Sequence, residues 1–125
     1  ENPLDRVQPV VTKDELLQLI QEARTVEAND RIFDYVTTLA EATRTHPMVE
    51  LGISPRGALA LCRMSKAHAF LAGRDYVVPE DVAAVFPDVC AHRLILSAKA
   101  RMMEEKAENI LAEILKSVDM PVLKA

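Results

Sequence analysis

The chain has 125 residues, of which 50% are hydrophobic and 27% charged, a size and balance typical of one globular domain and not of a disordered segment. Its net charge of −4 at pH 7 and sequence pI of about 5.4 make nucleic acid an unexpected partner, because nucleic-acid binders usually carry a basic face. The sequence contains no run of 18 apolar residues and no signal-like start, so we expect a cytoplasmic protein without a membrane span.

Composition and the first residues indicate a helical domain preceded by a linker. Aromatic residues make up only 4% of the chain, while alanine and leucine are frequent, which favours close-packed helices over a sheet. Residues 1–11 contain two prolines and no helical period, so we expect an extended linker there. Thr12 and Glu15 have the spacing of a capping box, which predicts a first helix over 13–26.

Two further helices follow at intervals set by proline and glycine. Apolar spacing predicts a second helix over 30–44, stopped by the His46-Pro47 pair because the residue before proline resists the helical conformation. A loop over 46–53 then leads to a third helix over 55–71, with Gly73 as its C-terminal stop. Apolar residues surround almost the whole third helix, Leu59 and Leu61 included, which predicts that it lies in the middle of a bundle.

The second half of the chain contains a connector and two more predicted helices. Residues 76–78 are β-like and are expected to form a short extended connector. Pro79 opens a fourth helix, which Pro87 is expected to divide or bend before it resumes through Leu94. A strong amphipathic pattern predicts a final helix over 105–118, while 97–104 could either extend that helix or form a loop. The predicted fold class is therefore all-α, a compact bundle of about five helices.

Cysteine and histidine residues do not indicate a disulfide or a metal site. Cys62 and Cys90 are isolated in helical runs, so we expect two free thiols in a reducing compartment. A zinc site needs several ligands at close spacing, and His46, His68 and His92 provide no such cluster. We expect no metal to be bound by this chain.

The sequence carries no complete catalytic motif. It lacks the phosphate-binding loop G-x-x-x-x-G-K-[ST], the nucleophile elbow G-x-S-x-G and the metal motif H-E-x-x-H. Carboxylates are plentiful, but most stand at helix N-termini or on exposed faces, where capping and solvated roles are expected. The carboxylates include Asp14, Glu15, Asp30, Glu80, Asp81, Glu104 and Glu105.

The start of the third helix contains the strongest functional signal. Ser54 is a good N-cap and Pro55 a good first residue, but Arg56 then places a cation where the helix dipole prefers anions. Free backbone N–H groups at a helix N-terminus bind anions, and a guanidinium beside them suits phosphate. Gly57 would leave the approach uncrowded. These four residues form a candidate phosphate site.

An ordinary surface role is the alternative for the arginines of this helix. Arg56 could pair with a nearby carboxylate such as Glu50 or Asp88, with little energetic consequence. Arg63 lies two turns later and within about 20° of Arg56 around an ideal helix. Both arginines could face one partner, or Arg63 could be solvated or ion-paired.

Four motifs and the closing helix together make the chain similar to a known family. They are Asn2-Pro-Leu-Asp-Arg-Val-Gln-Pro-Val, Gly52-Ile-Ser-Pro-Arg-Gly-Ala-Leu-Ala-Leu, Gly73-Arg-Asp-Tyr-Val-Val-Pro-Glu-Asp-Val, Ala91-His-Arg-Leu and the helix before Ser117-Val-Asp-Met-Pro. Over nearly its whole length the chain resembles the C-terminal helical lid of the MoxR-type AAA+ ATPases. It departs from the family at Gly57, where alanine is frequent, and in the helix-prone segment 97–104.

The resemblance implies a role for Arg56 and a division of the chain. Residues 1–11 correspond to the linker from a preceding nucleotide-binding subdomain, and 12–125 to the lid. Arg56 matches the sensor 2 arginine, which reaches the terminal phosphates of ATP, with Ser54, Pro55 and Gly57 forming the helix start. The Walker A and B elements, sensor 1 and the arginine finger belong to the large subdomain. The resemblance thus implies ATP and Mg²⁺ as cofactors of the parent ATPase and no hydrolysis by this chain alone.

The resemblance also implies partners, while two other classes of function remain open. Related ATPases act as hexameric, chaperone-like rings, in which a lid contacts its own large subdomain and the neighbouring subunit, often beside proteins with von Willebrand factor A domains. The helix–connector–helix unit around 55–85 also resembles DNA-binding modules, against which the acidic balance argues. A protein-adaptor bundle with no nucleotide role is the third possibility.

Overall fold

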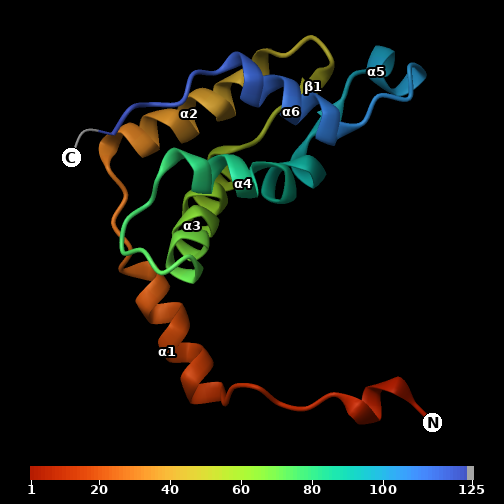
Figure 1. The fold of residues 1–125 in the computed structure, drawn as a ribbon. Coiled ribbons are helices and arrows are strands. Elements are labelled where there is room, and N and C mark those ends of the chain that lie inside the picture. The colour runs from red at the N-terminus through yellow and green to blue at the C-terminus, as the bar shows by residue number, and fades with distance from the viewer. Residues whose placement is uncertain (124–125) are drawn as a thin grey trace.

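The computed structural model describes residues 1–123 and shows a mostly helical domain (Figure 1). The all-α prediction is confirmed, with six α-helices in the described residues where about five were expected, and with a small two-stranded sheet that was not predicted. The elements in chain order are the 3₁₀ turn η1 (Pro3–Arg6), α1 (Lys13–Arg24), α2 (Asp30–Thr45), β1 (Val49–Leu51), α3 (Pro55–Leu71), α4 (Pro79–Cys90), the 3₁₀ turn η2 (Ala91–Arg93), β2 (Ile95–Leu96), α5 (Ala98–Met102) and α6 (Ala107–Ser117).

Helix starts follow the capping residues in the sequence. At α1 the N–H of Glu15 donates to Thr12 Oγ1 at 3.1 Å, and the N–H of Thr12 donates to Glu15 Oε1 at 3.0 Å, which completes the predicted capping box. At α2 the N–H of Arg31 donates to Asn29 Oδ1 at 2.9 Å. Local side-chain chemistry therefore fixes where these helices begin.

The segment from Pro87 onward corrects the two predictions made for the fourth helix and decides between the two alternatives for 97–104. Pro87 does not divide α4, which stays helical to Cys90 and then tightens into η2 instead of continuing to Leu94. Phe86 and Cys90 are fully buried on either side of Pro87, so their packing holds the helix despite the missing N–H. Ser97 caps the short α5, accepting from the N–H of Ala100 at 3.1 Å, so 97–104 is a separate element and not an extension of α6.

The two-stranded sheet joins segments that flank the candidate site. β1 and β2 pair antiparallel, with Val49 opposite Leu96 and Leu51 opposite Ile95. Strands this short carry too little apolar alternation to be seen in the sequence. The sheet ties the loop that leads into α3 to the segment that follows η2.

Burial of α3 differs from the prediction of a central helix. One face is buried through Gly57, Leu61, Ser65 and Ala69, and Leu61 is fully enclosed. Leu59, by contrast, is 57% exposed. Packing against α4, α1 and α2 covers only part of the helix, so apolar residues such as Leu59 remain at the surface.

Helix α1 projects from the rest of the domain and packs mainly against α3 (Figure 1). None of its residues is buried, and four large apolar side chains on it are 40–54% exposed: Leu16, Leu17, Leu19 and Ile20. Such a contiguous apolar surface is typical of an interaction face. In residues 1–123 no helix is both long and apolar enough to cross a membrane.

Candidate functional site

The start of α3 has the geometry that the sequence predicted. Ser54 is the N-cap, with Oγ accepting from the N–H of Gly57 at 3.2 Å, and Pro55 is the first helical residue. Arg56 is exposed. Within residues 1–123 its guanidinium forms no ion pair and no hydrogen bond, so neither Glu50 nor Asp88 neutralises it. The cation is directed to solvent at the positive end of a helix dipole.

Gly57 serves packing and not access to Arg56. It is buried, and a methyl group on it would lie 3.3 Å from Cδ of Arg93 and 3.3 Å from Cβ of Ile53. Those distances are slightly shorter than ordinary van der Waals contact, so the side chains of Arg93 and Ile53 would have to shift by a few tenths of an ångström to admit a methyl group. The glycine faces the interior, which corrects the expectation that it leaves the approach to the arginine open.

The exposed face of α3 continues as a basic and apolar strip. Arg63 lies two turns beyond Arg56 and is exposed, as is Leu59 between them. A surface hollow between α1, α2 and α3 contains Arg63, and its lining combines three cations with apolar side chains: Arg24, Phe33, Leu59, Cys62, Arg63 and Lys66. None of these cations has an ion-pair partner in the described part of the chain. An acidic chain thus gathers unpaired positive charge on one face.

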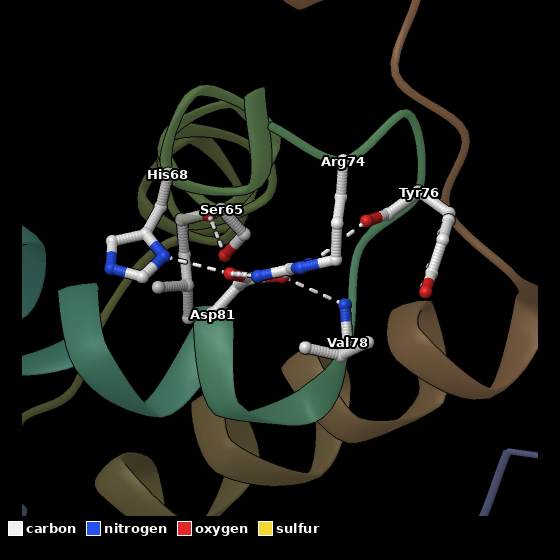
Figure 2. Close-up of polar contacts among 7 residues, drawn as sticks. Ser65, His68, Arg74, Tyr76, Val78 and Asp81 are labelled. Atoms are coloured by element: carbon white, nitrogen blue, oxygen red, sulfur yellow. Dashed lines mark hydrogen bonds and ion pairs between the residues drawn. The ribbon is translucent and has the colours of Figure 1, made fainter. Parts of the chain in front are cut away.

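A second arginine, Arg74 in the loop before α4, is neutralised within the domain, unlike Arg56 (Figure 2). Arg74 donates to Asp81 in bidentate fashion, with Nη1 2.7 Å from Oδ2 and Nη2 2.7 Å from Oδ1. His68 Nδ1 lies 2.7 Å from Asp81 Oδ1, and the N–H of Val78 donates to Asp81 Oδ2 at 2.8 Å. The side chain of Asp81 is only 1% exposed. We call these four residues the Asp81 cluster.

The Asp81 cluster keeps its carboxylate charged. Burial by itself would raise the pKa of Asp81, but the hydrogen bonds from Arg74, Val78 and His68 outweigh burial and hold this pKa at about 2. The sequence predicted a capping or solvated role for Asp81. Capping of Val78 is confirmed, whereas the burial and the link from α4 back to the end of α3 were not foreseen.

The two thiols and the histidines supply no second reactive site. Cys62 is half-buried and Cys90 buried, and both are free, as predicted. Burial raises the pKa of Cys62 and raises that of Cys90 to about 12, so both thiols stay protonated at neutral pH and are poor nucleophiles. The residues that the structure describes contain no group of three or more histidine, cysteine or acidic side chains placed to hold a metal ion.

Comparisons with known proteins identify the class. The family model of the AAA lid domain matches residues 41–114. The uncharacterized protein YeaC of Bacillus subtilis is 37% identical over 99% of this chain, and the chaperone MoxR1 of Mycobacterium tuberculosis is 32% identical over 93%. A crystal structure from Cytophaga hutchinsonii of a protein assigned as an ATPase superimposes with a TM-score of 0.86 at 32% identity over 94% of the chain.

The chain belongs to the AAA lid domain family. Within that family it is related to the MoxR-type ATPases, as the motifs around Arg56 and Arg74 had indicated. It spans only 39%, 33% and 38% of the lengths of the three proteins just described.

Proposed function

We propose that this chain is the lid of a MoxR-type, chaperone-like AAA+ ATPase, and that Arg56 is its sensor 2 residue. In this proposal residues 1–11 are the linker from the nucleotide-binding subdomain and 12–125 form the lid, of which 124–125 lie outside the described residues. ATP with Mg²⁺ would be bound on the large subdomain. Arg56 would approach its β- and γ-phosphate oxygens from the lid.

The unneutralised state of Arg56 is the observation that carries the proposal. A guanidinium forms bidentate hydrogen bonds with phosphate oxygens and keeps its charge at every physiological pH. Throughout residues 1–123 no carboxylate pairs with Arg56, although the chain carries 19 acidic residues. A cation kept free at an unfavourable helix end is consistent with an anionic partner from another domain.

The apolar face of α1 supports docking on an AAA+ module. Leu16 and Ile20 lie one helical turn apart, and both are more than one third exposed. Covering this face would remove apolar area from water, which favours association. Because α1 packs against α3, a module that covers α1 would also lie close to the helix that carries Arg56. Neighbouring subunits of a hexameric ring, or a von Willebrand factor A domain protein, are further proposed partners.

The proposed mechanism is a nucleotide-dependent change in lid position. One hydrogen bond to a charged group contributes only about 1.5–3 kcal/mol, so Arg56 would bias a nearly balanced hinge and not hold it alone. Loss of the γ-phosphate removes part of that attraction and lets the lid rotate about residues 1–11. The lid would then transmit hydrolysis to the rest of the ring.

The test is ATP hydrolysis by the full-length protein with Arg56→Ala. We expect kcat to fall about 100-fold, because a phosphate contact that strengthens in the transition state is lost. Arg56→Lys should recover only part of the rate, since an ammonium lacks the bidentate geometry. Arg101→Ala is the matched control: it removes another exposed arginine, from α5, which lies far from α3 in Figure 1.

Two outcomes decide the proposal. Arg56→Ala with near wild-type turnover, in a protein whose circular dichroism is unchanged, would remove the sensor assignment and favour the adaptor alternative. An equal loss in Arg101→Ala would show that any loss of positive charge from the lid lowers the rate, and the specific role of Arg56 would be rejected.

A further inference from the structure

We propose that Thr43 and Arg44, at the C-terminal end of α2, are positioning residues for Arg56. This inference rests on the proposed function of Arg56 and adds to it the means by which the lid aims that side chain. Neither residue would touch nucleotide. Both bind the backbone of Ile53, which directly precedes Ser54, the N-cap of α3.

Two hydrogen bonds hold both polar groups of Ile53 from consecutive residues of α2. The N–H of Ile53 donates to Thr43 Oγ1 at 3.0 Å, and Arg44 Nε donates to the carbonyl oxygen of Ile53 at 3.0 Å. The Thr43 hydroxyl in turn donates to the carbonyl oxygen of Ala40 at 2.6 Å. Its single proton is therefore directed into α2, and its lone pair is left to accept from Ile53.

The surroundings leave this segment little freedom. Thr43 is fully buried and Ile53 is 1% exposed. At Gly52 a methyl group would lie 2.7 Å from the backbone nitrogen of Arg44 and 2.7 Å from Thr43 Oγ1. The loop before α3 therefore lies directly against the end of α2, and only glycine fits at this position. We call Thr43, Arg44, Gly52 and Ile53 the α2 clamp.

The α2 clamp is separated from Arg56 by only two residues, both of which have fixed conformations. Ser54 is held by its hydrogen bond from the N–H of Gly57, and Pro55 has a restricted φ. Any shift of the Ile53 peptide is therefore passed directly to the first turn of α3. A displacement of about 1 Å at a reacting group can lower a rate by two orders of magnitude, so a clamp at this point controls more than local stability.

Thr45 supplies a matched control for a purely structural effect. It lies two residues beyond Thr43 on the same helix, and its hydroxyl donates to the carbonyl oxygen of Glu41 at 3.3 Å, as that of Thr43 donates to Ala40. Thr45 is exposed, and within residues 1–123 its only side-chain hydrogen bond is the one to Glu41, so none reaches 52–53. Thr43→Val and Thr45→Val each delete one hydroxyl–carbonyl bond within α2, to the third and the fourth preceding residue respectively, and only the first removes the acceptor for Ile53.

The experiment measures ATP hydrolysis by the full-length protein. We expect Thr43→Val to lower kcat about ten-fold with a smaller change in KM, and Thr43→Ser, which keeps the hydroxyl, to recover most of the rate. Thr45→Val should stay within about two-fold of wild type. Arg44→Ala provides the same test at an exposed position, where loss of folding is not expected; we expect a loss of about five-fold.

A double-mutant cycle with Arg56→Ala separates positioning from stability. If the clamp acts through Arg56, then Thr43→Val and Arg44→Ala should each change kcat less than about two-fold when Arg56 is already alanine, while their effects on thermal unfolding persist. Equal relative losses in both backgrounds would overturn the clamp proposal and leave the sensor proposal intact. An Arg56→Ala variant with normal turnover would instead reject the sensor proposal itself.

Discussion

Two arginines near two helix starts show opposite uses of the same side chain. Arg56 stands in the first turn of α3, is exposed and has no ion-pair partner in residues 1–123. Arg74 precedes α4 and is fixed by two 2.7 Å contacts to the buried carboxylate of Asp81. Arg74 also donates to the carbonyl oxygen of Tyr76 at 3.1 Å and lies 5.8 Å from its ring centroid.

The difference separates a residue that serves the fold from one available to a ligand. Arg74 and Asp81 join the end of α3 to the start of α4, so their charges are used within the domain. Arg56 forms no such link, although an exposed ion pair would have been easy to provide. Mutation of Arg74, which is ion-paired within the domain, should therefore change stability. Mutation of Arg56, which has no such pair in the described residues, should change activity.

The largest stability effect is expected for Arg74→Ala. The variant leaves the carboxylate of Asp81 buried with only the N–H of Val78 and His68 as partners. Because the Arg74 side chain is 27% exposed, we expect a loss of about 3 kcal/mol, the lower end of the range for removing one member of a buried ion pair. Urea denaturation of the 125-residue chain measures this loss, with Arg101→Ala as the exposed control. A change below about 1 kcal/mol would mean that Arg74 is as dispensable to the fold as a surface arginine.

A smaller, pH-dependent effect comes from Asp81 itself. Its pKa of about 2 in the folded chain lies below the ordinary aspartate pKa of 3.8, so the charged carboxylate stabilises the fold above about pH 4, and this contribution is lost as the pH falls towards 2. The difference between the two pKa values corresponds to about 2 kcal/mol. Unfolding free energies measured between pH 5 and 2 should fall by this amount more in wild type than in Asp81→Asn. Parallel pH profiles for the two proteins would contradict the assignment.

Local signals explain what the sequence predicted at the site. Ser54, Pro55 and Arg56 are neighbours in the chain, so capping and dipole rules apply to them before any folding is considered. Thr43 and Ile53 are ten residues apart, and His68 and Asp81 thirteen, so their contacts depend on how α2, α3 and α4 pack. The exposure of Leu59 was missed for the same reason: an apolar period shows which faces could be buried, but not which one a neighbour covers.

The smallest effect has the opposite sign and concerns Arg56 again. A cation in the first turn of a helix opposes the helix dipole by about 0.3–1 kcal/mol, and within residues 1–123 Arg56 gains no compensating ion pair. Arg56→Ala should therefore make the isolated chain slightly more stable, whereas the sensor 2 proposal predicts that the same change lowers ATP hydrolysis in the full-length protein. Thermal unfolding of the two chains side by side, at low ionic strength where the dipole is least screened, measures the gain. A loss of stability would show that the guanidinium contributes to its own domain, and Arg56 would then belong with Arg74 among the residues that hold the fold together.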